Sequence, residues 1–368
     1  MARIQVLTMK ILIITNHSYM LYRFRRELIA ELQKGHEVVL SMPFVGHEDD
    51  FQAMGLRCIN TDVDRRGINP KTDFKLMKTY RNLLKTERPD MVITYSIKPN
   101  IYAGLMCSMM GISFCANVQG LGTAFQRKGL AQFVTLLYRT ALKKAKVVFF
   151  ENEGNAQEFI DRKILPRNKI HVLPGAGINL QHYPLTVYPE NDRFHFLYLG
   201  RIMKEKGIDE LFTAMRRLHN ELGDKVILDL VGFFDDDYEA EVKSLVDEEI
   251  AVFHGFQTEP TPYYAAADSV VMPSYHEGLS NVLLEAAAIG RPIITTDIHG
   301  CKEAVDNGVS GLLCRVKDTD DLYQKMLQMA NLSRTARETM GLAAHRKVEQ
   351  EFEKTMVVRK TIEVIFMK

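Results

Sequence analysis

The sequence has too few cysteines, too widely scattered, to form the patterns that crosslink small secreted domains or bind zinc. Its five cysteines stand at positions 58, 107, 115, 301 and 314, and none belongs to a CxxC pair. An odd number without close pairs argues against both a disulfide framework and a zinc site. We therefore expect buried thiols in a protein of a reducing compartment.

Long apolar runs are also scarce. Near the start of the chain only residues 11–14 are continuously apolar, and no small-residue cleavage pattern follows them, which predicts a strand rather than a signal peptide. A charge-free stretch at 99–126 is interrupted by glycine, asparagine and glutamine, which favours a buried helix, strand and loop over a membrane span. These features favour a cytoplasmic location.

Several nucleotide-binding signatures are missing. No GxGxxG opens a helix after a strand, and no GxxxxGK[ST] occurs, which argues against dinucleotide oxidoreductases and P-loop proteins. The eleven histidines include no HExxH.

The length and composition favour two ordinary globular domains. A chain of 368 residues exceeds the size at which one hydrophobic core keeps growing. Its residues are 46% hydrophobic and 25% charged, a composition that excludes a disordered chain, a collagen and a coiled coil.

The net charge of +1 hides an asymmetry between the two halves. Residues 1–187 carry 26 basic and 15 acidic residues, whereas residues 188–368 carry 21 and 31. The basic excess gathers at 64–88 and at 127–146, and the second segment has an amphipathic helical pattern. Such asymmetry indicates an anionic partner of the first half, such as nucleic acid, a phosphate-bearing lipid or a membrane surface; a solvated helix face over a core remains the alternative.

Short β-branched runs alternate with helical patterns along the chain, which predicts an α/β fold with two parallel sheets. The expected strands lie at 11–15, 38–42, 91–95, 114–118, 147–150 and 169–173, and then at 195–199, 225–231, 251–254, 269–272, 293–296 and 311–314. Between the sets, residues 183–193 indicate a linker. Because such sheets bind ligands at the carboxyl ends of their strands, an interdomain cleft is the default site.

The most informative segment runs from His276 to Glu285, between two expected strands. Ser280 is a plausible N-cap, and Gly290 stands where a helix ends in a left-handed residue. The backbone N–H groups of residues 278–281 then form an anion site suited to a phosphate. Glu277, just before the helix, and Glu285, expected to face outward, suit sugar hydroxyls. Alternatively, Glu277 stabilises the helix dipole and Glu285 is solvated.

The loop after the first strand of the second half supplies two cations. Arg201 and Lys206 stand at the carboxyl end of that strand, beside a helix expected to begin near Gly207. The planar fork of an arginine and the point charge of a lysine can hold a diphosphate and neutralise it as it departs.

These motifs resemble glycosyltransferase family 4, the retaining enzymes with the two-domain GT-B fold of Rossmann-like domains. The resemblance rests on Arg201, Lys206, the E-x7-E motif from Glu277 to Glu285, and Gly290-Arg-Pro292. It implies that Glu277, Arg201 and Lys206 are catalytic, with Glu277 on the donor sugar and the two cations on the diphosphate. It also implies a nucleotide site formed by Gly200, Phe256, Gly278, Leu279, Ser280, Asn281 and Glu285, with Glu285 on the ribose and the backbone near Phe256 at the base.

The first half resembles the branch of that family that builds bacterial polysaccharides and lipid-linked glycans. The residues concerned are Tyr22-Arg-Phe-Arg25, Ile68-Asn-Pro70, Val118-Gln-Gly-Leu-Gly122 with Phe125, and Phe149-Phe-Glu-Asn152. Family members often have two glycines after the first strand, where this chain has Asn16-His17-Ser18. Many also have a histidine where this chain has Ile97, so either Lys98 or Asn100 substitutes for it or no group does. The expected acceptor and donor loop residues are His17, Lys98, Asn100, Gln119, Gly120 and Gly122.

Acidic DxD patterns, which bind manganese in sugar transferases of another fold, begin at Asp62, Asp235 and Asp318. The last two lie in polar, turn-like segments and are expected to be solvated. The pair at Asp62 supplies too few oxygens for a hard cation. We expect no metal site and no metal requirement.

The sequence therefore predicts a retaining glycosyltransferase that moves a sugar from a UDP-sugar to a saccharide on a polyprenyl diphosphate. Residues 1–187 are the expected acceptor domain, with a helix at 352–368 packing back on it, and residues 188–351 are the expected donor domain. The partners are the donor, the lipid-linked acceptor and an anionic membrane surface at the inner face, with no nucleic acid. A UDP-sugar 2-epimerase and a catalytically silent nucleotide-sugar-binding subunit are the alternatives.

Overall fold

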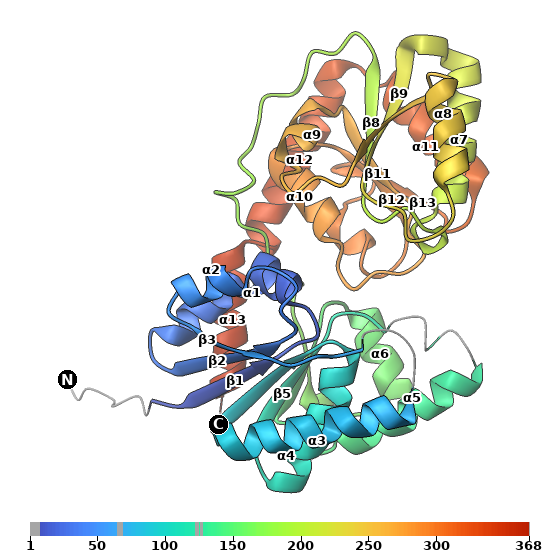
Figure 1. The fold of residues 1–368 in the computed structure, drawn as a ribbon. Helices are drawn as coiled ribbons and strands as arrows, with labels where there is room; N and C mark the ends of the chain where they lie inside the picture. The colour runs from blue at the N-terminus through green and yellow to red at the C-terminus, as the bar shows by residue number, and fades with distance from the viewer. Residues whose placement is uncertain (1–7, 65–68, 122–124, 126–127, 368) are drawn as a thin grey trace, which may run out of the picture. The chain divides into compact units, whose positions relative to one another are not determined.

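The computed structural model describes residues 8–64, 69–121, 125 and 128–367. Over these residues the chain forms two compact units, the first from Met1–Gly177 with Thr355–Lys368 and the second from Ile178–Lys354 (Figure 1). Each unit is a parallel sheet with helices on both faces, as the alternation of strands and helices predicted.

Among the described residues of the first unit, seven strands form one parallel sheet in the order β3-β2-β1-β4-β5-β6-β7. The strands are β1 Lys10–Ile14, β2 Glu37–Met42, β3 Arg57–Asn60, β4 Met91–Tyr95, β5 Ser113–Val118, β6 Val147–Phe150 and β7 Ile170–Val172. The order reverses between β1 and β4, which is the switch point where open α/β sheets bind ligands.

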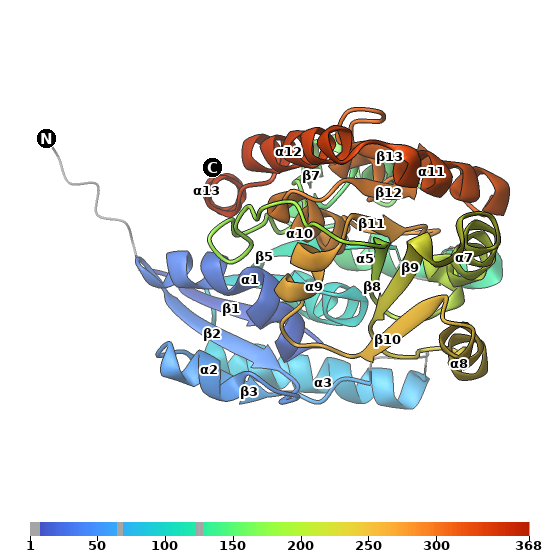
Figure 2. The ribbon, with the colours of Figure 1, turned by 90° about the horizontal axis from the view of Figure 1, so that it is seen from above.

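Helices cover both faces of this sheet (Figures 1 and 2). They are α1 Ser18–Gln33, α2 Glu48–Ala53, α3 Pro70–Glu87, α4 Gly104–Met110, α5 Lys128–Leu142, α6 Glu153–Asp161 and α13 Lys354–Phe366, with a π-helical turn at Pro99–Ala103. The first core cluster joins one sheet face to α3, α4, α5 and α6. The second joins the other face to α1, α2 and α13, where Val358 and Ile365 of α13 are buried.

Strand β3 was not predicted from the sequence. It is an edge strand of four residues, paired only with β2, and both of its end residues are exposed. Arg57 and Asn60 therefore interrupt the apolar pattern by which the other strands are recognised.

The second unit has the same architecture. Its six described strands form one parallel sheet in the order β10-β9-β8-β11-β12-β13. The strands are β8 Phe194–Leu199, β9 Val226–Val231, β10 Ala251–Gly255, β11 Ser269–Met272, β12 Ile293–Thr296 and β13 Gly311–Cys314. Helices α7 Ile208–Leu222, α8 Glu239–Asp247 and α11 Thr319–Asn331 lie on one side, and α9 Thr261–Ala266, α10 Asn281–Ile289 and α12 Arg334–Glu351 on the other (Figure 1).

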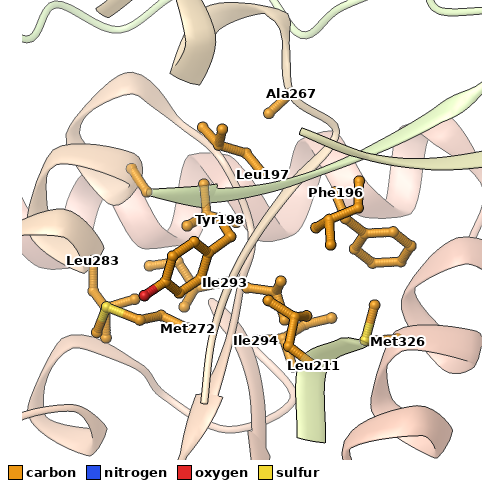
Figure 3. Close-up of a cluster of buried hydrophobic side chains, with 14 of the residues drawn as sticks. Phe196, Leu197, Tyr198, Leu211, Ala267, Met272, Leu283, Ile293, Ile294 and Met326 are labelled. Atoms are coloured by element: carbon orange, nitrogen blue, oxygen red, sulfur yellow. The ribbon is translucent and has the colours of Figure 1, made fainter. Parts of the chain in front are cut away.

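The core of the second unit is a continuous apolar layer on both sheet faces. Its buried side chains include Phe196, Tyr198, Leu211, Met272, Leu283 and Met326 (Figure 3). This packing fixes the strands whose carboxyl ends carry the predicted site.

Residues 183–193, predicted as a linker, pack against the second unit. Tyr188 is buried, and its hydroxyl donates to the carbonyl oxygen of Asp268 at 2.6 Å. The Arg291 guanidinium, fully buried, donates to Thr186 Oγ1 at 2.7 Å and to the Val187 carbonyl at 2.9 Å. Burial lowers the pKa of Arg291 to about 10.

Candidate active site

Four loops meet at the carboxyl edge of the second sheet and are joined by backbone hydrogen bonds. Gly200 N–H donates to Val231, Gly232 N–H donates to Gly255, and Tyr275 N–H donates to the carbonyl of Glu205, each at 2.9 Å. The loops after β8, β9, β10 and β11 are thus one connected surface. The parallel sheet places all four there because carboxyl ends of parallel strands share an edge.

Glycine is required where two of these loops touch. A Cβ on Gly232 would lie 1.8 Å from the carbonyl oxygen of Gly200, and Gly232 has a φ of 156°. Beneath them, the buried Tyr198 hydroxyl donates to the Arg201 carbonyl at 2.6 Å. Burial raises the pKa of Tyr198 well above its usual value. This phenol therefore stays a neutral donor and fixes the backbone at Arg201.

Two predicted catalytic side chains contact each other directly. Lys206 Nζ forms a hydrogen-bonded ion pair with Glu277 Oε1, and both side chains are largely buried. The ammonium group comes from the loop after β8, which continues into α7 at its Gly207 N-cap, as expected. The carboxylate comes from the loop after β11. The pair brings a cation and a carboxylate to the start of α10.

Helix α10 begins and ends where the sequence predicted. Ser280 is the N-cap residue in an extended conformation, although its hydroxyl donates to Met272 Sδ at 3.4 Å and makes no capping bond. Gly290 ends the helix with a φ of 85°. Residues 278–281 therefore stand at the positive end of the helix, where backbone N–H groups favour an anion.

Glu285 does not face outward, contrary to the expectation from the sequence. Its side chain is buried, with 2% of the residue exposed, and its Oε2 accepts a hydrogen bond from the Tyr264 hydroxyl at 2.9 Å. Helix α10 is buried along most of its length, because its own residues are apolar on nearly every face. A carboxylate in such a helix is held by a partner rather than by water.

The acidic run at 235–237 is also not simply solvated. Asp235 Oδ2 accepts from Arg201 Nη1 at 2.7 Å, and Asp236 Oδ2 accepts from the Lys204 backbone N–H at 2.9 Å. Backbone bonds between Ile202 and the loop after β9 complete the contact. Asp235 therefore orients Arg201. Sequence reasoning missed this role, although the place of Asp235 in the loop after a strand was a signal.

The remaining predicted second-unit residues lie on the same edge or just beyond it. Gly200 follows the last residue of β8. Phe256 follows β10 with its ring exposed and packed edge-on against Phe233, the ring centroids lying 6.0 Å apart. Asp318, also expected to be solvated, caps α11 by accepting from Asp321 N–H at 2.9 Å.

The first unit has a pocket of about 520 Å³ at the switch point of its sheet. Five of the six residues predicted for the acceptor and donor loops line it, and the sixth, Gly122, lies outside the described residues. The five are His17, Lys98, Asn100, Gln119 and Gly120. Residues that follow three different strands are thus brought to one cavity.

The two candidates for the missing histidine differ in what they can do. Asn100 is buried, with Oδ1 accepting from Thr94 at 2.7 Å and Nδ2 donating to the Asn117 carbonyl at 2.8 Å. Its amide therefore ties neighbouring strands together. Lys98 Nζ donates to Asp73 Oδ1 at 2.9 Å, and its side chain lines the pocket.

Within the described part of the chain, no three His, Cys, Asp or Glu side chains are grouped so that they could hold a metal ion. No described helix is both long enough and apolar enough to cross a membrane.

Sequence families match both units. Residues 193–331 match the family model described as Glycosyl transferases group 1, and residues 10–152 match the model described as Glycosyl transferase 4-like. Together with the two parallel sheets and the E-x7-E segment at α10, they define the protein as a glycosyltransferase. The chain belongs to glycosyltransferase family 4 and has the GT-B fold, so the resemblance seen in the sequence is confirmed.

Curated relatives include two Campylobacter jejuni enzymes. The N,N'-diacetylbacillosaminyl-diphospho-undecaprenol alpha-1,3-N-acetylgalactosaminyltransferase is 28% identical over 83% of this chain and 85% of that protein. The N-acetylgalactosamine-N,N'-diacetylbacillosaminyl-diphospho-undecaprenol 4-alpha-N-acetylgalactosaminyltransferase is 27% identical over 70% of this chain and 72% of that protein. Among solved structures, Anabaena HepE in complex with UDP and glucose superposes with a TM-score of 0.80 at 16% identity, covering 98% of this chain and all of that one.

Proposed function

We propose that this glycosyltransferase moves a hexose or N-acetylhexosamine, with retention of anomeric configuration, from a UDP-sugar to a saccharide carried on polyprenyl diphosphate. The names of the two Campylobacter relatives, which act on undecaprenyl-diphosphate-linked saccharides, support this acceptor class. The complex of HepE with UDP and glucose supports the donor class.

The donor roles follow from charge and position at the edge of the second sheet. Arg201, Lys206 and the N-terminus of α10 would hold the diphosphate, because two cations and the positive end of a helix stand at this edge. The Ser280 N–H is not among the donors, since it bonds to the Gly300 carbonyl at 2.9 Å. Glu277 would bind hydroxyls of the donor sugar, while the Lys206 ammonium group would contact both Glu277 and the phosphates. Glu285 would bind the ribose, and the backbone at Phe256 would meet the base.

The same groups account for the chemistry. When the bond between the sugar and the diphosphate breaks, negative charge grows on the departing UDP, and preorganised cations lower the free energy of that transition state. Two cations and a helix N-terminus can do this without a metal ion. Asp235 keeps Arg201 in place for the task, since their ion pair is 2.7 Å long.

The first unit would supply the acceptor site. The pocket lined by His17, Lys98 and Gln119 lies at the switch point of the sheet, and its mixed polar lining suits a saccharide. We assign Lys98 rather than Asn100 to the place of the family's histidine. The Asn100 amide uses both its oxygen and its nitrogen within the fold, whereas the Lys98 ammonium carries three donors besides a positive charge and gives one bond to Asp73.

The acceptor is a lipid, and the first unit has a face suited to an anionic membrane. Helix α3 exposes five basic side chains but no carboxylate, since Asp73 and Glu87 are buried. The five are Lys71, Lys75, Lys78, Arg81 and Lys85. The ring of Phe74 is also 71% exposed.

Helix α5, on the same sheet face, extends this surface. Arg139 on α5 and Lys143 and Lys144 just after it are exposed and carry the basic charge. The apolar side chains of Phe133 and Leu136 are 47% and 58% exposed. Basic and apolar side chains together favour attachment to the inner face of the membrane. Arg65 and Arg66, which belong to the basic segment 64–88, lie outside the described residues.

The observation that carries the donor proposal is the contact of Lys206 with Glu277 beside the N-terminus of α10. A thermal-shift screen over nucleotide sugars tests it. A ligand at 100 times its dissociation constant adds about 2.7 kcal/mol to the free energy of unfolding. We expect UDP and UDP-sugars to raise the melting temperature of the wild type, and Lys206→Ala to abolish that rise. If all nucleotides leave the melting temperature unchanged, the donor proposal is wrong.

A further inference from the structure

A second polar pocket lies beside the first in the same unit, and the proposed function leaves it unassigned. It encloses about 350 Å³ between the end of β3 and the first turns of α3. Asp62 and Asp64, the pair weighed above as a metal site, are in its lining. Asp73, Thr72 and Thr79 of α3 line the opposite wall.

The lining chemistry suits a neutral, hydroxyl-rich ligand. Of the ten side chains that line the pocket, only Leu76 is apolar, and the others are hydroxyls, an amide, three carboxylates and two ammonium groups. Carboxylates accept hydrogen bonds from sugar hydroxyls, while threonine and asparagine side chains can both donate and accept. Because carboxylates outnumber ammonium groups, a phosphate or an acidic sugar would meet unfavourable charge.

A buried ion pair joins this pocket to the acceptor pocket. Lys98 lines both cavities, and its Nζ donates to Asp73 Oδ1 at 2.9 Å. Both side chains are about nine-tenths buried. Burial, with a hydrogen bond to Asp73, raises the pKa of Tyr102 above its usual value. Asp73 and Lys98 are therefore held firmly at the border between two adjacent cavities.

We propose that the pocket between β3 and α3 binds a second, neutral sugar unit of the acceptor, so that the saccharide passes Lys98 from one cavity into the other. The inference rests on the proposed function for the existence of a saccharide acceptor. It adds that the enzyme selects acceptors of at least two sugars, and that it selects against acidic units at this position.

Binding of a free neutral disaccharide tests the pocket independently of turnover. In the full-length protein with labelled threonine methyl groups, N,N'-diacetylchitobiose is the probe, and a galacturonic acid dimer is the acidic comparison. Thr72 and Thr79 face the pocket, so their methyl resonances report on occupancy. We expect both resonances to shift saturably with the neutral disaccharide and to be unmoved by the acidic one.

Two threonines on the same helix provide a matched pair of variants. Thr79→Trp places a large side chain in the pocket and should abolish the shift of the Thr72 resonance. Thr86→Trp puts the same side chain at an exposed position seven residues further along α3, outside the pocket lining, and should leave the shift intact. Asp62→Asn is a milder second variant, which should weaken neutral binding and allow the acidic dimer to bind.

The outcomes separate this proposal from the donor proposal, since UDP binding is measured by thermal shift on the same sample. If UDP stabilises the protein but the disaccharide does not shift the Thr72 and Thr79 resonances of the wild type, the pocket proposal is overturned while the donor site stands. The same follows if the Thr72 resonance shifts in Thr79→Trp as much as in the wild type. If the disaccharide shifts them as expected but UDP does not stabilise the protein, the proposed function fails and the saccharide site stands.

Discussion

A Cβ placed on Gly300 would lie 2.5 Å from the carbonyl oxygen of Gly278, at the residue that follows Glu277. The Gly300 carbonyl in turn accepts a hydrogen bond from Ser280 N–H at 2.9 Å. The loop after β12 thus presses on the segment that begins α10. Because Gly300 has no side chain, the segment at Glu277 and Gly278, which belongs to the proposed donor site, can lie directly against it.

We predict that Gly300→Ala lowers UDP affinity as well as stability. The substitution forces residues 277–278 to move, and its φ of 92° costs about 1–2 kcal/mol for a residue with a Cβ. Gly308→Ala is the control, because Gly308 has a φ of 79° with nothing within 4 Å of the added Cβ. Thermal unfolding should show that backbone strain destabilises both variants. UDP titration should show weakened binding only in Gly300→Ala. Equal UDP affinity in both variants would contradict the donor-loop role.

We predict that Glu277→Gln and Lys206→Ala nearly abolish transfer, whereas Glu285→Ala mainly raises the donor KM. The first two residues stand where transition-state charge develops, so each could contribute a few kcal/mol to the barrier. Glu285 is held by Tyr264 and would bind a remote part of the donor. Steady-state kinetics separates the two effects. Full turnover by Glu277→Gln with unaltered donor affinity would remove that residue from the site.

We predict that the α3 and α5 face binds anionic vesicles in a salt-dependent way. Each basic residue near such a surface contributes about 1 kcal/mol, and the Debye length falls from roughly 10 Å at 0.1 M salt to 3 Å at 1 M. Co-sedimentation should weaken for Lys78→Gln/Arg81→Gln. It should be unchanged for Arg359→Gln/Lys360→Gln, which makes the same charge change on α13 against the opposite sheet face. Equal binding to neutral and anionic vesicles would contradict the electrostatic account.

We predict that His195 stabilises the second unit more at low pH than at high pH. Asp229 accepts from His195 Nδ1 and His254 Nε2, each at 2.7 Å. The bond to Asp229 raises the pKa of His195 above 6.5, with nearby Asp268 adding to this effect, while burial and Arg193 oppose it. The pKa of His195 is higher in the folded state than in the unfolded state. Its contribution to the free energy of unfolding is therefore complete below pH 6.5 and is lost as the pH rises through the folded-state pKa.

Thermal unfolding of His195→Gln should therefore show a larger loss relative to wild type at pH 5.5 than at pH 8.5. The same loss at both values would show that protonation of His195 makes no contribution.

The sequence identified much of this molecule because its strongest signals are local. The ends of a helix depend on the backbone preferences of a few residues close together in the sequence. The helix ends at Gly207, Ser280 and Gly290 therefore stand where expected. Strand β3 was missed because its two end residues are exposed and polar, which leaves too few apolar residues to indicate a strand. The environment of Glu285 and the partner of Arg201 were missed because Tyr264 and Asp235 come from other elements, 21 and 34 residues away. Only the folded chain brings those partners together.

We predict from the same cluster of cations that transfer needs no metal ion. We expect turnover to persist in excess chelator, since Arg201, Lys206 and the α10 N-terminus carry the diphosphate charge. Strict manganese dependence that is lost in Asp62→Ala would contradict this expectation.

The most direct test of the whole account is the product formed from a UDP-sugar and a polyprenyl-diphosphate saccharide. We expect one sugar to be added to the acceptor for each UDP released, with the anomeric configuration of the donor retained in the new linkage by NMR. Release of UDP and a 2-epimeric free sugar with the acceptor unchanged, or inversion at the anomeric carbon, would contradict the account.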